Sequence, residues 1–251
     1  IWTREVTVYL VPVTTSCSMR RVLSWNYDPN NAFFQHQLHP YTHKGHYFLT
    51  DSQGGPLFPE TAESATGAGT TVNAYDYHSF VEEEKYNLIH SGKEWYGDEF
   101  SVSLEHAYPF QLPDLVSGEN VRVRVAAAAR SGQSSSFRVE TADQYLGTLR
   151  VRQTDLSGYV ATYAYETDSL FSFLPSSQVV TIQLEYLRPD SNSEGWLNHI
   201  CLNGRAQLQM GSEDQLAFRD SRSVETGAAS TFRIADAAGV MVWDVSDPGH
   251  P

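Results

Sequence analysis

Residues 121–125 read Val121-Arg122-Val123-Arg124-Val125, with a valine at every second position. Successive side chains of a β-strand point to opposite faces of the sheet, so this run predicts a strand with one apolar and one polar face. Further strand-like runs, separated by turn residues, follow at 136–140, 145–151, 158–167, 179–186 and 196–202. No long helical pattern interrupts them. The sequence therefore predicts an all-β fold, with antiparallel sheets stacked as a β-sandwich of jelly-roll type.

The first third of the chain has a less regular pattern. Residues 4–12 alternate in polarity and predict a strand, and residues 45–50 predict a shorter one. Residues 56–71 are rich in Gly, Ala, Ser and Thr, which predicts an exposed loop. Residues 71–88 carry many aromatic side chains, and we interpret them as extended structure. The glutamates at 82–84 then fit a solvated sheet edge better than a helix.

These patterns divide the chain into three predicted parts. Residues 1–85 form an irregular N-terminal β region, either the end of a preceding domain or a small unit docked on the sandwich. Residues 86–245 form the β-sandwich, and residues 246–251 form a linker to a further domain. The chain starts without methionine or a signal pattern, so we expect an internal fragment of a longer protein.

The composition limits the classes of partner. The 251 residues contain 17 Lys and Arg against 30 Asp and Glu, a formal net charge of −13, so nucleic acid is not an expected partner. No apolar run is long enough to span a membrane. The two cysteines, Cys17 and Cys201, are too few for a disulfide scaffold. A single disulfide bond between them remains an alternative.

Ser91-Gly92-Lys93-Glu94-Trp95-Tyr96-Gly97-Asp98-Glu99-Phe100 places two aromatic rings between two glycines, ahead of an alternating strand through Phe100, Val102 and Leu104. We interpret it as a corner at which Trp95 and Tyr96 fill the edge of the sandwich core. On this interpretation, Trp95→Ala is strongly destabilising. The alternative is an exposed aromatic platform for a partner or a sugar.

The residues contain no strong catalytic or metal-binding motif. Phosphate-binding loops, the hydrolase nucleophile elbow and the common zinc motifs are absent, and we predict no cofactor. The histidines at 36, 39, 43 and 46 (His36, His39, His43, His46) are weak metal candidates, and hydrogen-bonded loop histidines are the preferred interpretation. Acidic pairs such as Asp98-Glu99 could coordinate calcium, although a role in surface solubility explains them equally well.

One pair of residues has the composition of a cysteine nucleophile. His199 and Cys201 are two residues apart, so they share a face of their strand. A cysteine within a central strand lacks the exposure and oxyanion donors that acyl transfer needs. We therefore predict a core cysteine and no catalytic residue.

Four segments together resemble one family. They are the stretch 91–100, residues 39–50, Gly195-Trp196-Leu197-Asn198-His199-Ile200 with Asn203, and Val242-Trp243-Asp244-Val245-Ser246-Asp247-Pro248. The chain is similar in these segments to the PorU family, the gingipain-like sortases of type IX secretion, in the region upstream of the peptidase domain. Lys93, Asp98, Asn198 and Ser246 depart from the family pattern, where Arg, Glu, Asp and Thr are usual.

The resemblance implies a role at the bacterial outer-membrane surface. The family removes the sorting domain from exported cargo and attaches the cargo to anionic lipopolysaccharide, with a catalytic His and Cys in a peptidase domain beyond residue 251. The chain itself is then a non-catalytic accessory region. Its implied partners are that peptidase domain, cargo sorting domains and an outer-membrane β-barrel.

Four aromatic residues are structural or partner-surface candidates: Trp95, Tyr96, Trp196 and Trp243. The first three are also the candidates for a carbohydrate-binding module, which is one alternative function, and an adhesin-like structural domain is another. At the carboxyl end, residues 231–234 and 240–243 predict an antiparallel hairpin that packs Trp243 against the sandwich.

Overall fold

The computed structural model describes residues 8–11, 23–40, 68–158, 160–212, 215–223 and 229–244, and no helix occurs among them. Eight strands form two facing sheets: β5 (Ala74–Glu82), β7 (Glu105–Gln111), β8 (Val121–Arg130), β9 (Ser135–Glu140), β10 (Tyr145–Val151), β11 (Tyr165–Phe173), β12 (Val179–Leu187) and β13 (Glu194–Gln207). The shorter strands are β1 (Val8–Val11), β2 (Leu23–Asp28), β3 (Phe33–Leu38), β4 (Ala68–Val72), β6 (Glu99–Phe100), β14 (Ala217–Phe218), β15 (Ala229–Phe232) and β16 (Met241–Asp244).

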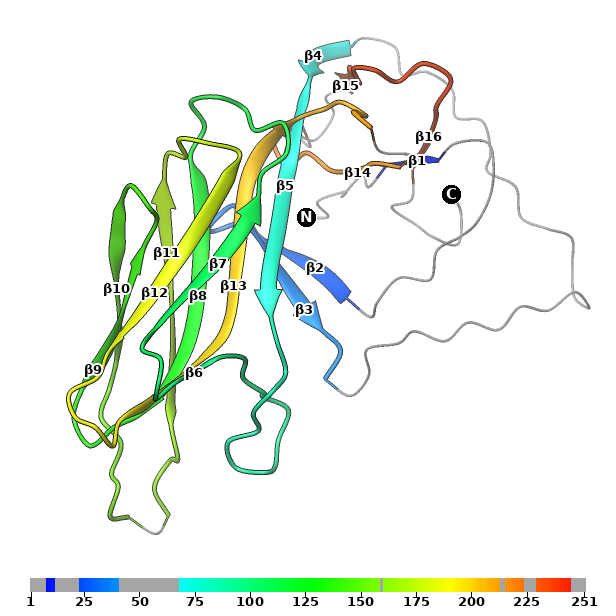
Figure 1. The fold of residues 1–251 in the computed structure, drawn as a ribbon. Helices are drawn as coiled ribbons and strands as arrows, with labels where there is room; N and C mark the ends of the chain where they lie inside the picture. Colours follow the sequence, from blue (N-terminus) through cyan, green and yellow to red (C-terminus); the bar gives the residue numbers. More distant parts are fainter. Residues whose placement is uncertain are drawn as a thin grey trace, which may run out of the picture.

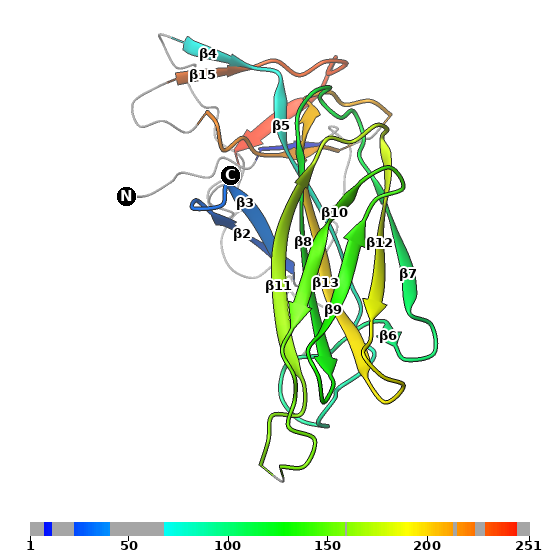
Figure 2. The same ribbon diagram turned by 90° about the vertical axis from the view of Figure 1, so that its left-hand side faces the viewer.

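The two sheets have the strand order of a jelly roll. One sheet runs β11-β8-β13-β5 and the other runs β10-β9-β12-β7, with every neighbouring pair antiparallel. Strands that follow one another along the chain therefore mostly alternate between the sheets, as two Greek keys require. Figures 1 and 2 show the sheets face to face along the length of the molecule. The predicted all-β jelly-roll sandwich is confirmed.

The core lies between the inner faces of these sheets. Val121, Val123 and Val125 are fully buried there, and Arg122 and Arg124 point the other way, as the alternation predicts. From the opposite sheet, Phe137 lies so close to Gly195 that a Cβ at residue 195 would stand 2.7 Å from its ring. The two sheets approach closely at this position, and only glycine fits there.

The outer face of the β11-β8-β13-β5 sheet is covered by the β2–β3 hairpin. The ring of Trp25 meets those of His78 and Phe80 with centroids 4.0 and 5.7 Å apart, both edge-on. Figure 2 shows the hairpin on the side of this sheet away from the core. Neither strand of this hairpin was predicted from the sequence.

A second, smaller group of strands lies at one end of the sandwich, near β4 in Figure 1. It contains the β14-β1-β16 sheet and the parallel pair β15-β4. Its apolar cluster is formed by Tyr75, Ala206, Leu208, Met210 and Phe218. Because Tyr75 and Ala206 belong to β5 and β13, this cluster continues from the sandwich strands.

The hairpin predicted for residues 231–243 is wrong. β15 pairs in parallel with β4, and β16 pairs with β1, Tyr9 opposite Trp243. The connection takes left-handed backbone at Asp236 and Gly239 (φ 53° and 77°) and leads β16 to a different partner. β4 also occupies the end of the loop predicted for residues 56–71.

One other expectation needs correction. The strand predicted through Phe100, Val102 and Leu104 stops after Phe100, and Val102 is 98% exposed in the bend before β7. β5, which precedes residue 86, pairs with β13 at the edge of one sandwich sheet. The division into domains at residues 85 and 86 stays a prediction.

Some expectations fall outside the described residues, namely the strand at 45–50, Cys17, His43, His46 and the linker at 246–251. Cys201 is a free, buried cysteine. Within the described ranges, no helix has the length and apolar character that crossing a membrane requires.

Candidate binding groove

The loop between β5 and β6 is held against the outer sheet face by two buried rings. Tyr96 and Trp196 are 8% and 4% exposed and pack together on Ala128 of β8. Tyr96 also exchanges backbone hydrogen bonds with Tyr86 across the loop, at 2.8 and 2.9 Å. The left-handed Gly92 (φ 87°) turns the chain between them. The loop therefore has a fixed place, and so do Glu94 and Trp95, which directly precede Tyr96.

A β-bulge shapes the sheet beside this loop. In the β13–β8 pairing, Leu197 lies opposite Ala127 and His199 opposite Ala126, so Asn198 is an extra residue. A bulge changes the direction of the side chains that follow it. Leu197 points into the core, whereas Asn198 and the next residue, His199, both line the outer face.

A groove of about 630 Å³ lies between the hairpin, the loop and this face of the sheet. Its volume is within the range of ligand-binding clefts. The lining residues come from five separate segments: His36, Gln37, Leu38, His39 and Pro40; Glu82 and Glu84; Lys93, Glu94 and Trp95; Glu166; and Asn198 and His199. We define these residues as the groove.

Three carboxylates of the groove, those of Glu82, Glu94 and Glu166, have neutral hydrogen-bond partners. Glu166 accepts from the hydroxyl of Tyr96 at 3.0 Å, and Glu94 accepts from the amide of Asn198 at 3.4 Å. Glu82 contacts Nε2 of His36. Burial raises the pKa of Glu82 and of Glu166 above the ordinary value, and the nearby Glu94 carboxylate adds to both effects.

His36 and His199 do not neutralise this charge. Burial lowers the pKa of His36 to about 4, and burial with the adjacent His36 lowers the pKa of His199 to about 4. Both imidazoles are therefore neutral at pH 7. His199 is further fixed by Gln35 at 3.0 Å and Asn198 at 3.1 Å.

The prediction that Trp95 is buried is wrong. Its side chain is 38% exposed at the groove, and the neighbouring Tyr96 fills the apolar site instead. Period-2 alternation explains the difference, since adjacent residues of an extended segment point in opposite directions. Trp196 is buried, and Trp243 is half-buried on β16. The functional roles assigned to these four rings stay predictions.

The four histidines do not form a described metal site. His36 and His39 both line the groove, but His43 and His46 lie outside the described residues. In the part of the chain that the structure describes, no three His, Cys, Asp or Glu side chains are arranged to hold a metal ion. Of the candidate calcium pair, Asp98 instead binds Lys85 at 2.8 Å and the hydroxyl of Tyr108 at 3.0 Å.

His199 and Cys201 share the outer face of β13, as predicted, but their surroundings do not suit a nucleophile. Cys201 is 0% exposed beneath the hairpin, and its thiol donates to the carbonyl of Phe34 at 3.3 Å. Burial raises the pKa of this thiol to about 12. A cysteine nucleophile reacts as an exposed thiolate, so this pair does not have the properties of a catalytic one.

Several groove residues were not recognised in the sequence as site residues. Glu82 and Glu84 were visible in the three-glutamate run, which was interpreted as a solvated sheet edge. Glu94, Glu166 and Asn198 had no distinguishing local pattern, because the groove is assembled from segments far apart in the chain.

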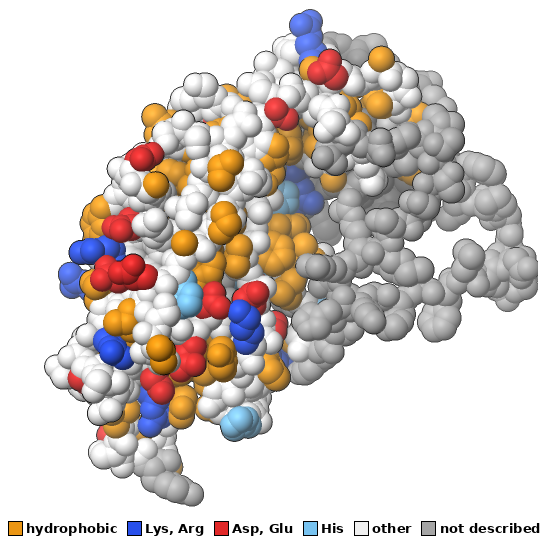
Figure 3. Space-filling view, viewed as in Figure 1, with side chains coloured by type: hydrophobic (Ala, Val, Ile, Leu, Met, Phe, Trp, Pro, Cys, Tyr) orange, Lys and Arg blue, Asp and Glu red, His pale blue; other side chains and the backbone are white. Residues whose placement is uncertain are grey.

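The charge distribution elsewhere is mixed. On the face shown in Figure 3, acidic, basic and apolar side chains are interspersed over the sandwich without a continuous basic band. The net charge of −13 is therefore not offset by a basic patch on this face.

No protein-family model matches the chain, and no curated protein matches it by sequence. Among solved structures, the chain is similar to dimeric latent PorU from Porphyromonas gingivalis, with a TM-score of 0.63 and 18% sequence identity. The match covers 82% of this chain and 22% of the PorU chain, so the chain spans about a fifth of that protein's length. At this identity the likeness is one of fold.

Two other structures match more weakly. The CBM36-1 domain of a multidomain xylanase from the hindgut metagenome of Trinervitermes trinervoides has a TM-score of 0.33 at 10% identity, covering 51% of this chain and 98% of that domain. The insecticidal delta-endotoxin Cry8Ea1 from Bacillus thuringiensis has a TM-score of 0.35 at 10% identity, covering 80% of this chain and 42% of that chain.

Proposed function

We propose that the chain is a non-catalytic accessory region of an exported, PorU-like cysteine peptidase or sortase that acts at the bacterial outer-membrane surface. The proposal is supported by the agreement of two observations. The fold is similar to latent PorU over 82% of the chain, and the chain contains sequence segments that resemble the same family. In the whole protein, a peptidase domain after residue 251 would perform the chemistry.

Two of the four family-like segments, residues 91–100 and 195–200, are neighbours in space, which supports a structural role for them. Glu99 and Phe100 of the first segment pair as β6 with Trp196 and Gly195 of the other. Tyr96 joins Trp196 in the same buried cluster. Residues that are a hundred positions apart in the chain therefore build one corner of the jelly roll.

The partner surface in this proposal includes the end of the described chain. Met241 and Val242 on β16 are 40% and 53% exposed, an unusual exposure for two adjacent apolar side chains. A peptidase domain that follows β16 would cover them. Cargo sorting domains and an outer-membrane β-barrel remain further proposed partners.

The experiment mixes the purified chain with the separately produced peptidase domain of a PorU-like sortase. We expect the two to bind, and we expect Val242→Asp to weaken that binding. Val179→Asp is the matched control, because Val179 is a similarly exposed strand valine (51%) on β12, in a different sheet. The chain alone should show no thiol-dependent cleavage of peptides. Absence of binding, or such cleavage, would contradict the proposal.

A carbohydrate-binding role is the second candidate, and the exposed ring of Trp95 at the groove favours it. The burial of Tyr96 and Trp196 removes the other two rings of the expected platform. A panel of neutral oligosaccharides, tested by tryptophan fluorescence on the chain and on Trp95→Ala, checks this candidate. No response from the unaltered chain would eliminate it.

A further inference from the structure

The β2–β3 hairpin is attached to the sandwich through side chains and not through a β-ladder. Among the described strands, β2 and β3 pair with each other and with no other strand. None of the described residues that form the core between the two sheets belongs to the hairpin. Loss of the hairpin contacts therefore leaves the sheets and their core intact, and a segment attached in this way can open as a separate unit.

Three histidines lie at the contact between the hairpin and the sheet. His36 belongs to β3, and its ring stacks on that of Phe80 of β5 with centroids 4.0 Å apart. His199 of β13 lies edge-on to His36 at 5.1 Å. His78 of β5 lies edge-on to Trp25 of β2 at 4.0 Å. Each imidazole thus contacts a ring on the other side of this interface.

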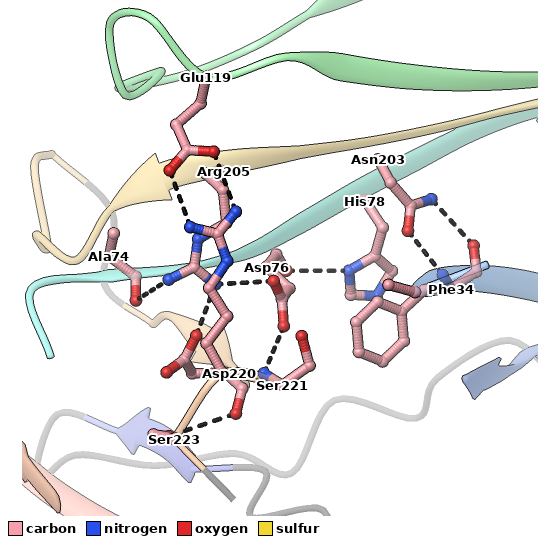
Figure 4. Close-up of polar contacts among 12 residues, drawn as sticks. Phe34, Ala74, Asp76, His78, Glu119, Asn203, Arg205, Asp220, Ser221 and Ser223 are labelled. Atoms are coloured by element: carbon pink, nitrogen blue, oxygen red, sulfur yellow. Dashed lines mark hydrogen bonds and ion pairs between the residues drawn. The ribbon is translucent and has the colours of Figure 1, made fainter. Parts of the chain in front are cut away.

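Charged groups surround these imidazoles from the elements packed against them. Nδ1 of His78 lies 3.2 Å from the carbonyl oxygen of Asp76 (Figure 4). The charged and titratable side chains are Glu82 beside His36, with Glu84 and Glu94 acting on Glu82; Asp76 and Arg219 near His78; Arg124 and Asp168 near His199; and Asp28 and His39 on the hairpin itself.

Protonation of the three imidazoles opposes the closed position of the hairpin. Burial is the largest cause that lowers the pKa of His36, His78 and His199 to about 4, and the nearby arginines lower the pKa of the last two further. An exposed histidine has a pKa of about 6.5, so each imidazole binds a proton more readily once the hairpin has opened. Burial raises the pKa of Glu82, which acts in the opposite direction, but this is one carboxyl against three imidazoles.

We propose that the β2–β3 hairpin is a pH-operated cover, which separates from the outer face of the sheet in mildly acidic solution while the sandwich stays folded. Separation uncovers the ring of Phe80 and the thiol of Cys201, which donates to the carbonyl of Phe34 in the closed form. The proposal is independent of the accessory role proposed above. It gives the outer face of the sheet a closed and an open form (Figure 2).

The test measures how fast dithiodipyridine modifies Cys201 in the Cys17→Ser chain, in which Cys201 is the only thiol. The rate for the urea-unfolded chain at the same pH, divided by the rate for the folded chain, gives a protection factor that is corrected for the chemistry of the thiol. We expect this factor to fall by at least about tenfold from about pH 7 to about pH 5. Opening of the hairpin alone should depend only weakly on added urea, because it exposes little surface.

Hydrogen exchange in the same solutions monitors the sandwich. The amides of β12 should stay protected at the lower pH, whereas those of β2 and β3 should lose protection. This difference separates opening of the hairpin from unfolding of the whole chain.

His78→Asn should reduce the fall in the protection factor by about tenfold, because one fewer imidazole binds a proton on opening. His90→Asn is the matched control, since His90 lies in an exposed loop. If His78→Asn leaves the hairpin open at neutral pH, His199→Gln replaces it as the test variant. A glutamine there can keep hydrogen bonds to Gln35 and Asn198.

Three results would overturn the proposal. The first is equal protection of Cys201 at the two pH values. The second is loss of protection in β12 together with β2 and β3, which would show unfolding of the whole chain. The third is an unchanged pH dependence in both His78→Asn and His199→Gln. None of these results bears on whether the chain binds a peptidase domain, so the two proposals fail separately.

Discussion

Asn203 and Phe34 exchange two hydrogen bonds, although they are 169 residues apart in the sequence. The backbone N–H of Phe34 donates to Oδ1 of Asn203 at 2.6 Å, and Nδ2 of Asn203 donates to the carbonyl of Phe34 at 2.9 Å (Figure 4). The side-chain amide thus replaces a neighbouring strand for both polar groups of Phe34. These groups are buried, and buried backbone groups need partners.

The first prediction is that Asn203→Asp destabilises the protein by about 2–4 kcal/mol, because a carboxylate cannot donate to Phe34 and repels its carbonyl. Urea unfolding measures the free energy. Asn26→Asp is the control, since the amide of Asn26 bonds Gln37 at 3.2 Å on the exposed side of the same hairpin. A change of less than about 0.5 kcal/mol for Asn203→Asp would show that the hairpin does not depend on this pair.

The second prediction concerns Arg205, which joins the sandwich to the segment after β14. Its guanidinium binds Asp76 at 2.7 Å and Asp220 at 2.5 Å, and it donates to the carbonyl of Ala74 at 3.0 Å (Figure 4). Arg205→Met leaves two carboxylates buried without their cation and should cost about 3–5 kcal/mol.

The control for this prediction is Arg222→Met. Arg222 binds Glu119 at 2.8 Å on the surface, where ion pairs contribute at most about 1 kcal/mol. Chemical unfolding of both variants measures the difference. Equal losses of stability would show that the buried network has no special importance.

The third prediction separates the two tryptophans beside the groove. Trp196 is 4% exposed and Trp95 is 38% exposed. Trp196→Ala should therefore destabilise by about 3–5 kcal/mol, as a large-to-small change in a packed cluster. Trp95→Ala should change the unfolding free energy by about 1 kcal/mol or less. Calorimetry of the two variants checks this, and a larger loss for Trp95→Ala would reverse the assignment.

The fourth prediction is that stability falls as the pH decreases from about 6.5 to about 4. Burial lowers the pKa of His36, His78 and His199 to about 4, so the folded protein holds these imidazoles neutral over a range in which the unfolded chain binds protons. Each such histidine should contribute about 1.4 kcal/mol per pH unit to the slope.

The raised pKa values of Glu82 and Glu166 act in the opposite direction, because the folded state then binds protons before the unfolded state does. The histidine contribution is isolated by His78→Asn. This variant should reduce the slope of the unfolding free energy against pH by about 1.4 kcal/mol per pH unit, which corresponds to one proton. His90→Asn, at an exposed loop position, is the matched control for the loss of a histidine. Identical slopes for His78→Asn and the unaltered chain would contradict the assignment.

The sandwich strands could be predicted because their pattern is local. The alternation of valine and arginine over residues 121–125 predicts which side chains are buried and which face solvent. The structure has the same alternation. The β2–β3 hairpin could not be predicted in this way, since Phe33 and Phe34 are both apolar and both buried. One of them faces Arg124 and the other is held by Asn203, and only the folded sheet brings these partners together.

The errors near the carboxyl end have a similar cause. Residues 235–239 have the composition of a hairpin turn, but the strands on either side pair with β4 and β1 from the first third of the chain. Strand pairing depends on long-range packing more than on the turn alone. The groove was equally hidden, because the bulge at Asn198 and the position of Glu166 have no local signature.

The position of the hairpin has a consequence for the timing of folding. Its partner Asn203 is made 169 residues after Phe34, which at about 5–20 residues per second is a delay of roughly ten to thirty seconds. During that interval Trp25 and Phe34 have no finished sheet to pack against. A newly made chain therefore displays an aromatic hairpin until its last sandwich strand appears, and a chaperone that recognises exposed aromatic strands has this period in which to bind it.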